Sequence, residues 1–339
     1  MSQMRTTDSL PQAVRDVRQT FVQLIAMETP VTSQMGKAPR PMSTTPEWPI
    51  KTFAAPSSAG VIEGVAPDYS SVGENNLANK TMLLGRFQKL GRFPYVSEET
   101  KLMVKQYAVP TDAMQDNVKD KGLELHRDLE YTLLSDNESV PAAAGATASK
   151  TRGIPRWVSY DDNRFTDAAT TPVIGYRTPS GSILISKSTA SAVTETNINA
   201  VIASVATARK RTDGNWLGIC TPLMKQQFTS FTRLDPAYTT SVLPVRRFNQ
   251  KDDQTITMNV TMYDSDFGPI KLLTSFWLDS TVHFLMLDMD MVEIGYAKAP
   301  TYKLLPDDGA SDRGLWNAII VAECLNPQAH GKAITGAVG

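Results

Sequence analysis

The chain has 339 residues, of which 41% are hydrophobic, so it can build one large or two ordinary folded domains. Its 34 lysines and arginines nearly balance its 35 aspartates and glutamates, and the net charge of -1 argues against tight binding to DNA or anionic lipid. Its two cysteines, Cys220 and Cys324, lie inside apolar runs that fall short of the ~20 residues of a membrane span, so we expect neither a disulfide framework nor a membrane segment.

Residues 9 to 28 are predicted to form a short amphipathic helix. Asp8 or Ser9 can cap this helix, and Pro11 fits its first turn. One stripe carries its apolar side chains, Val14, Val17, Phe21 and Leu24. No apolar signal-peptide core precedes the helix, so we expect folding in a reducing cytosol. The apolar face must dock on its own body or on a neighbouring subunit, and the second option suits an arm.

A proline-rich segment follows, with seven of the 21 prolines between Pro30 and Pro67. Proline lacks a backbone donor and fixes φ, so this segment can be neither a helix nor a central strand. Disorder is also disfavoured, because Trp48 and Phe53 lie in the segment and disordered chains contain few aromatics. We therefore predict an extended arm that becomes ordered by contact with other subunits.

A long hairpin is predicted to continue from this arm. One limb runs over residues 47 to 55, a tip of small residues covers 57 to 76, and a return limb runs from 80 to 96. A two-stranded ribbon is marginal by itself in water, so the hairpin needs a neighbouring surface. Trp48 and Phe53 are its candidate anchors, because aromatic side chains bury the most area per residue at interfaces.

Residues 112 to 134 are predicted to form the longest helix, about 35 Å long. Asp112 and Gln115 form a capping pair, and one face carries Met114, Val118, Leu125, Leu129 and Leu133. Gly122 in the middle costs about 1 kcal/mol relative to alanine, so we expect a close packing contact or a slight bend there. A linker of small residues follows, and its tail leads into an extended segment, GIPRWV.

The C-terminal half alternates helices and strands. Thr194 caps a helix whose apolar face comprises Ile198, Val201, Ile202 and Val205, and the basic run Arg209, Lys210 and Arg211 ends it, on a solvated surface. The strand WLGIC and a helix from Thr221 to Phe231 come next. The strands TITMNVTMY and IKLLTSFW are joined by a hairpin through DSDFGP. The more continuously apolar strands VHFLMLDMD and NAIIVAECL should be central in their sheets.

No catalytic grouping is present in the sequence. His126, His283 and His330 lack metal-ligand spacing. The tripeptide DFG at 266–268 matches a kinase signature, but the other kinase motifs are absent and the same residues suit a turn. Asp288 and Asp290 would point to one face of a strand and could hold a divalent ion, although a solvated strand end is the favoured interpretation. We expect no enzyme, no cofactor and no metal site.

Six segments, taken in order, resemble the major capsid proteins of tailed bacteriophages with the Hong Kong 97 fold. They are TPVTSQMGK, TPEWPIKTFA, AGVIEG, ELHRDLEYTLL, YDSDFGPIKLL and VAECLNPQAHGKAITG. The return limb, LLGRFQKLGRFPYVS, keeps only a loose likeness to the family's pattern. The resemblance spans most of the chain.

The resemblance implies an α+β, Hong Kong 97-like capsid fold with an N-terminal arm, an E-loop hairpin, a peripheral domain with a long spine helix, and an axial α/β domain. On this chain the arm would cover residues 1–45, with its short amphipathic helix, and the E-loop 46–96. The peripheral domain would cover 97–190, with the spine helix at 112–134, and the axial domain 191–290. Residues 291–339 would return to the peripheral domain and form the C-terminal strand.

The function implied is that of a virion structural protein. Copies would assemble as pentamers and hexamers into an icosahedral head around double-stranded phage DNA, in the host cytoplasm and without a membrane. Portal, scaffold and decoration proteins are further candidate partners, and contact with the packaged DNA would be weak and non-specific. The subunit-interface candidates are Val14, Phe21, Leu24, Trp48, Phe53 and Tyr69.

Two rival functions stay open at this point. An encapsulin-like nanocompartment shell would use the same fold to enclose cargo instead of a genome. A hydrolase would need a divalent site at Asp288 and Asp290.

Overall fold

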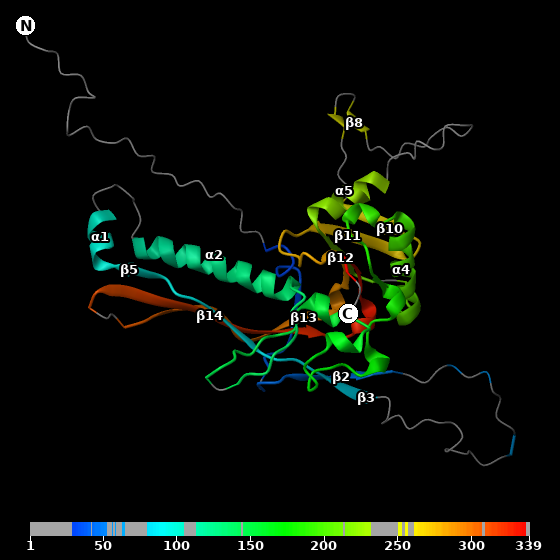
Figure 1. The fold of residues 1–339 in the computed structure, drawn as a ribbon, viewed down its shortest axis with the longest axis horizontal. Coiled ribbons are helices and arrows are strands. Elements are labelled where there is room, and N and C mark those ends of the chain that lie inside the picture. Colours follow the sequence, from blue (N-terminus) through cyan, green and yellow to red (C-terminus); the bar gives the residue numbers. More distant parts are fainter. Residues whose placement is uncertain are drawn as a thin grey trace, which may run out of the picture.

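The computed structural model describes residues 29–41, 43–52, 56, 58, 63–64, 80–104, 113–143, 145–212, 214–231, 250–252, 255–256, 261–306 and 309–336. Two β-sheets with helices packed on them form the body of this mixed helix and sheet protein (Figure 1). The helix predicted over residues 9 to 28 lies outside the described residues. None of the helices in the described ranges is long and apolar enough to cross a membrane.

The first sheet has five strands, and its two longest strands pair antiparallel. The order is β1-β13-β14-β4, and β5 pairs with the outer part of β14. The strand bounds are β1 Gly36–Lys37, β4 Gln88–Arg92, β5 Tyr95–Ser97, β13 Val292–Leu304 and β14 Ser311–Cys324. β14 therefore has partners on both sides, which confirms the central position predicted for NAIIVAECL.

Helix α2, Ala113–Leu134, extends along this sheet, and the shorter α1, Glu98–Val104, lies near its outer end (Figure 1). The predicted long helix is confirmed over these residues, and it buries Met114, Leu125, Leu129 and Leu133 as expected. The predicted close contact at Gly122 is also confirmed. A Cβ atom there would lie 3.2 Å from Cζ2 of Trp316, whose Nε1 donates to the Val118 carbonyl at 2.8 Å. The missing side chain therefore lets the helix approach the sheet.

The second sheet has six strands of mixed direction, in the order β10-β11-β7-β12-β15-β6. Their bounds are β6 Ile183–Leu184, β7 Trp216–Cys220, β10 Met262–Ser265, β11 Gly268–Thr274, β12 Val282–Asp288 and β15 Gly331–Ile334. Every residue of β7 and β12 is buried, which confirms the central position predicted for VHFLMLDMD. The predicted DSDFGP hairpin joins β10 to β11, with Ser265 opposite Gly268.

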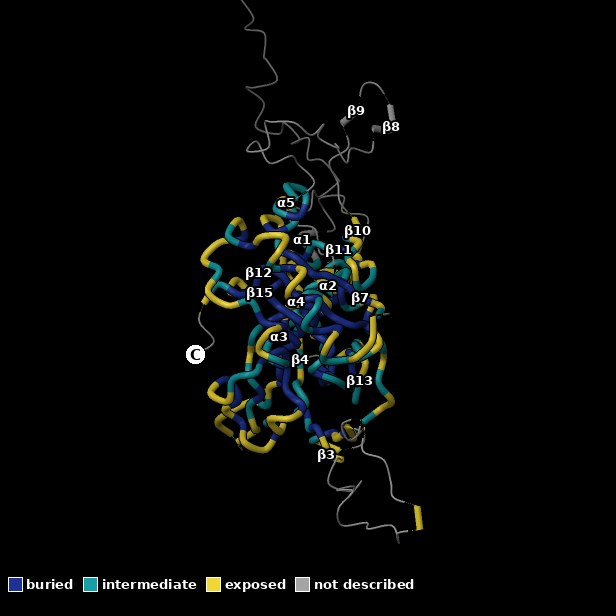
Figure 2. Tube along the Cα trace, turned by 90° about the vertical axis from the view of Figure 1, so that its right-hand side faces the viewer, coloured by how far each residue is buried: buried dark blue, intermediate teal, exposed yellow. Residues whose placement is uncertain are grey.

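Helices α4, Glu195–Arg209, and α5, Pro222–Phe231, share one hydrophobic cluster with this second sheet. The Thr194 side chain accepts from the Asn197 amide at 3.3 Å, so the predicted N-cap is confirmed. A second cluster joins the other side chains of β7 and β12 to α2 and to the first sheet. The two sheets therefore share one continuous core, and Figure 2 shows the buried stretches gathered in the middle of the body.

Smaller elements complete the described chain. Two antiparallel pairs are β2 Glu47–Lys51 with β3 Lys80–Leu84, and β8 Gln250–Asp252 with β9 Thr255–Ile256. The remaining helix is the four-residue α3, Ile154–Trp157. Single 3-10 turns lie at Asp162–Arg164, Ile174–Tyr176, Ser180–Ser182, Ala190–Ala192, Met289–Met291 and Pro327–Ala329.

Two predictions about local structure were wrong. The segment GIPRWV was predicted to be extended, but it forms α3, because Pro155 fits the first turn of a helix. The return limb of the hairpin was predicted to run to residue 96, but only β3 pairs with β2. Residues 88–92 and 95–97 pair with β14 instead, since that long strand offers a buried edge that a two-stranded ribbon lacks.

Candidate assembly elements

The arm begins, within the described residues, with a turn that is held by α2 of the same chain. The backbone amides of Val31 and Thr32 donate to the Glu130 carboxylate at 3.0 and 2.8 Å, and the Thr32 hydroxyl donates to it at 2.5 Å. Glu130 and Val31 are both fully buried. A buried carboxylate is costly unless it is hydrogen-bonded, so these three bonds fix where the arm enters the body.

The base of the hairpin is fixed by Trp48. This side chain is 7% exposed and lies against Trp157, with a ring-centroid distance of 5.7 Å. Its Nε1 donates to the Cys324 carbonyl at 3.0 Å, which ties β2 to the end of β14. A Cβ atom on Gly85 would lie 2.7 Å from Cγ2 of Val321 and 3.3 Å from the Trp48 ring, so glycine lets the chain after β3 pass close to both.

This position corrects the prediction for Trp48. We expected its indole to anchor the hairpin on a neighbouring subunit, because the arm has no apolar partner nearby in sequence. The structure instead supplies Trp157 and the end of β14, which are more than a hundred residues away along the chain. Val31 and Met35 are likewise buried in the body of their own chain, so the described part of the arm does not depend on other copies for its apolar contacts.

A buried arginine packs against Trp157, the residue that contacts Trp48 at the hairpin base. The Arg152 side chain is 1% exposed, and its guanidinium group lies 4.5 Å from the centroid of the Trp157 ring. Its Nε donates to Glu138 at 2.9 Å, and its Nη1 donates to the Thr170 carbonyl at 2.9 Å. Burial lowers the pKa of Arg152, and the Glu138 carboxylate opposes that shift. The Trp157 ring also contacts Trp48. The Arg152 guanidinium group, which packs on Trp157, therefore helps to fix the position of the hairpin base.

A second ion pair holds the chain immediately after the hairpin. Arg86 donates through two nitrogens to the Asp167 carboxylate, with the Nη2–Oδ1 distance at 3.0 Å. Asp167 also accepts from the hydroxyls of Ser139 and Thr170, at 3.1 and 3.0 Å. The hydrogen bond from Arg86 is the main cause that lowers the pKa of Asp167 to about 2. The hairpin therefore emerges from a base that is fixed on both strands.

Several large apolar side chains remain exposed on the described surface. Two pairs lie close together in sequence, Phe93 with Tyr95 and Val173 with Ile174, and each of these side chains is more than half exposed. The others are Met82, Leu123, Tyr131, Ile185, Leu223, Met262, Phe276 and Leu304. Scattered exposed apolar residues are normal, but adjacent pairs are candidate contacts between copies of an assembling chain.

The remaining interface candidates are Val14, Phe21, Leu24, Phe53 and Tyr69, and all five lie outside the described residues. Sequence reasoning missed the Phe93 and Tyr95 pair, because these residues were assigned to the return limb of the hairpin. The alternation of Arg92, Phe93, Pro94 and Tyr95 gave no signal that both aromatic rings would be exposed.

His283, His330 and both cysteines have structural environments, whereas His126 is exposed on α2. Nε2 of His283 lies 2.9 Å from the Lys187 carbonyl, and Nδ1 of His330 accepts from the Asp288 amide at 3.2 Å. Burial lowers the pKa of His330 to about 3, so its imidazole is neutral. Cys220 and Cys324 are buried free thiols, as predicted, and burial raises the pKa of Cys220 to about 11.

The prediction of a solvated strand end agrees with Asp290, which is exposed, but is wrong for Asp288. Asp288 is fully buried, forms an ion pair with Arg209, and accepts from the Asp290 amide at 3.2 Å. We predicted a solvated surface for Arg209, and this is wrong, because its side chain is only 6% exposed. Across the residues that the structure describes, no group of three or more histidines, cysteines and carboxylates could hold a metal ion. The Asp288 carboxylate is therefore engaged by Arg209 and by the Asp290 amide.

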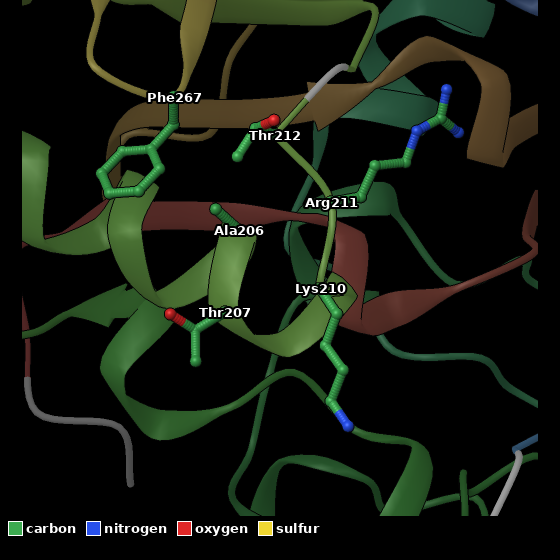
Figure 3. Close-up of a pocket in the computed structure, with 6 residues that line it drawn as sticks. All are labelled: Ala206, Thr207, Lys210, Arg211, Thr212 and Phe267. Atoms are coloured by element: carbon green, nitrogen blue, oxygen red, sulfur yellow. The ribbon is translucent and has the colours of Figure 1, made fainter. Parts of the chain in front are cut away.

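A shallow cavity of about 450 Å³ lies at the C-terminal end of α4. It is lined by Ala206, Thr207, Lys210, Arg211, Thr212 and Phe267. In Figure 3 the long side chains of Lys210 and Arg211 point away from the Phe267 ring and from each other. An active site needs several polar groups that converge on one point, and this cavity lacks that convergence.

Comparison with known proteins gives a family match by sequence and a similarity of fold. A family model described as SU10 major capsid protein matches residues 2–337. No curated protein sequence matches the chain. Among solved structures, the cyanophage P-SCSP1u capsid is similar over 98% of this chain and 99% of its own, with a TM-score of 0.62 at 10% identity.

Two further solved structures are similar over nearly their whole length. A chain from Mycobacterium phage Bobi covers 97% of this chain and 98% of its own, with a TM-score of 0.59 at 11% identity. The capsid of a native GTA particle covers 97% of both chains, with a TM-score of 0.55 at 10% identity. Because the sequence identities are only 10–11%, these similarities show a shared fold and nothing further.

Proposed function

The chain belongs to the SU10 major capsid protein family and is a major capsid protein of a phage head, and we propose that it is built as a Hong Kong 97-like shell subunit. The observation that supports this most is the combination of a family match over residues 2–337 with a long helix lying along a sheet of long strands. The protein is a structural component of the virion, and its function is mechanical.

We propose that the two sheets correspond to the two domains of that fold. The five-stranded sheet with α2 is the peripheral domain, and α2 is the spine helix. The six-stranded sheet with α4 and α5 is the axial domain, which lies around the centre of each capsomer. The division at residues 97, 191 and 291 then needs three changes: residues 88–96 join the peripheral domain, and β6 and β15 join the axial domain.

We propose that copies assemble in the host cytoplasm as pentamers and hexamers that close into an icosahedral head around double-stranded DNA. The near-neutral charge supports this, because identical subunits then approach without strong mutual repulsion. Portal, scaffold and decoration proteins would complete the head, and contact with packaged DNA would be weak and non-specific. Negative-stain microscopy of the purified chain tests the proposal. Closed shells, rings or tubes are expected, and single subunits at every concentration would contradict it.

We propose that the hairpin beyond its fixed base and the residues before Val31 lie on adjacent subunits. Their interface candidates are Val14, Phe21, Leu24, Phe53 and Tyr69. Replacing Phe53 and Tyr69 by alanine should lower the yield of shells without lowering the unfolding free energy of the isolated subunit. Equal losses of shells and of subunit stability would show that these residues serve the fold.

The nanocompartment alternative is not favoured, because the matching family is one of phage capsid proteins and the similar structures include phage capsids and a gene transfer agent capsid. Nuclease treatment of intact particles would separate the two functions. Protected double-stranded DNA is expected inside a head, and an enclosed enzyme without DNA would favour the nanocompartment.

A further inference from the structure

The arm crosses from one face of the five-stranded sheet to the other. Val31 is buried on the α2 face, β1 then pairs in parallel with β13, and the Ala38 amide donates to the Ile294 carbonyl at 3.1 Å. On the opposite face, a Cβ atom placed on Gly295 would lie 3.1 Å from Cγ of Pro41. Residues 36–41, which we call the strap, therefore wrap the edge of the sheet on the way to the hairpin.

Two glutamates face each other beneath the strap. Glu293 of β13 and Glu323 of β14 are directly opposite in the antiparallel register, so their side chains share one face of the sheet. A Cβ atom on Gly36 would lie 3.3 Å from Cγ of Glu293, and one on Gly295 would lie 2.5 Å from Oε1 of Glu323. The glycines of the strap and of β13 thus leave just enough room for the two carboxyl groups.

The pair has no cation to neutralise it within the described part of the chain. Glu323 is 7% exposed, and the electrostatic influences on its carboxyl group are burial and the neighbouring Glu293. The charged residues on the strap are Lys37 and Arg40, and the nearest one on the hairpin is Glu47; all three are exposed. Burial and then Glu293 raise the pKa of Glu323 to about 7.

We propose that the strap is a proton-dependent clasp, closed while Glu323 is protonated beside Glu293 and loosened when Glu323 is ionised. A protonated Glu323 carboxyl group carries no charge and can stay in its buried position beside Glu293. An ionised Glu323 is disfavoured by burial and by the neighbouring Glu293 and needs hydration, which a movement of the strap away from Glu293 and Gly295 would allow. A rise in pH therefore opens the strap and leaves the turn at Val31 in place.

Opening of the strap also affects the chain that leads to the hairpin, because the strap ends six residues before β2. While the strap is closed, the segment between Pro41 and Glu47 has a fixed starting point on the sheet. Once it opens, the hairpin base is held by Trp48 and Arg86 alone among the contacts described above. The strap is then free to move near neutral pH between two fixed points, the turn at Val31 and the hairpin base.

Hydrogen exchange of the full-length, unassembled chain tests the clasp. The amide of Ala38 is the reporter, because its hydrogen bond to Ile294 exists only while the strap is closed. After correction for the intrinsic exchange rate, its protection should fall about tenfold between pH 6 and pH 8, as the ionised fraction of a group with a pKa near 7 rises from about one tenth to about nine tenths. Trypsin cleavage after Lys37 should accelerate in parallel.

The variants Glu323→Gln and Glu293→Gln remove the second charge and keep the size of the side chain. Glu323→Gln should hold the protection of Ala38 at pH 8 within about twofold of its value at pH 6, because its amide cannot ionise, and Glu293→Gln should lose less protection than the natural chain, because burial alone then opposes ionisation of Glu323. Glu47→Gln, an exposed carboxyl on the hairpin, is the matched control and should lose protection as the natural chain does. If Glu323→Gln fails to fold, the reduced loss expected for Glu293→Gln still tests the clasp.

Three outcomes would overturn the clasp. One is constant protection of Ala38 in the natural chain from pH 6 to pH 8, and another is the same loss in Glu323→Gln and Glu293→Gln. The third is an equal loss in peptides from β12, which would indicate opening of the whole subunit. Each measurement uses the isolated subunit, so the result does not depend on shell formation.

Discussion

Truncation of Trp48 to alanine should destabilise the subunit itself. The indole is 7% exposed, packs on Trp157 and donates to the Cys324 carbonyl, so the change leaves a cavity and an unpaired carbonyl group. Large-to-small changes of buried aromatic residues cost about 3–5 kcal/mol. Denaturant unfolding of the unassembled subunit, followed by tryptophan fluorescence and circular dichroism, measures this loss. Shell yield should fall in proportion to the folded subunit.

Two companion variants separate the contributions at this position. Trp48→Phe keeps an aromatic ring against Trp157 but removes the donor to Cys324, so it should cost about 1–3 kcal/mol. Met82→Ala is the matched control, because Met82 lies on the same hairpin and is 53% exposed; it should change stability by less than about 0.5 kcal/mol. The reasoning is refuted if Trp48→Ala unfolds at the same denaturant concentration as the natural chain and yet forms no shells. Trp48 would then act between subunits.

Three further predictions concern the contacts that fix α2, the arm and the hairpin base. Gly122→Leu should destabilise the subunit by about 1–3 kcal/mol in denaturant unfolding, because its side chain would enter the Trp316 ring, whereas Leu123→Ala on the exposed side should be nearly neutral. Glu130→Ala should release the turn at residues 31–32, and unchanged hydrogen exchange of those amides would contradict it. The pKa of Asp167 lies at about 2, below its ordinary 3.8, so its pairing stabilises the fold above pH ~4 and the stabilisation is lost as pH falls toward ~2. The unfolding free energy of Asp167→Asn should therefore be lower by about 2 kcal/mol at pH 7, and this difference should vanish near pH 2.

Elements defined by local pattern were predicted correctly from the sequence. The stripe on α2, the cap at Thr194 and the apolar strands β7, β12 and β14 all depend on residues a few positions apart, since hydrogen bonding and side-chain periodicity repeat within a turn or a strand. The close approach at Gly122 was also predicted, because a glycine inside a strong helical pattern has a cost that only packing offsets. The family was found in the same way, from short segments in a fixed order.

Contacts between distant segments were decided by the tertiary structure. No local pattern indicates that Trp48 meets Trp157, that residues 88–97 leave the hairpin for β14, or that Arg209 is buried beside Asp288. Nor does it show that Glu293 and Glu323 face each other under the arm. These contacts depend on which apolar surfaces, strand edges and charged groups the folded chain brings together. The sequence by itself therefore determined the elements and the family, while the burial of each aromatic and charged side chain required the assembled fold.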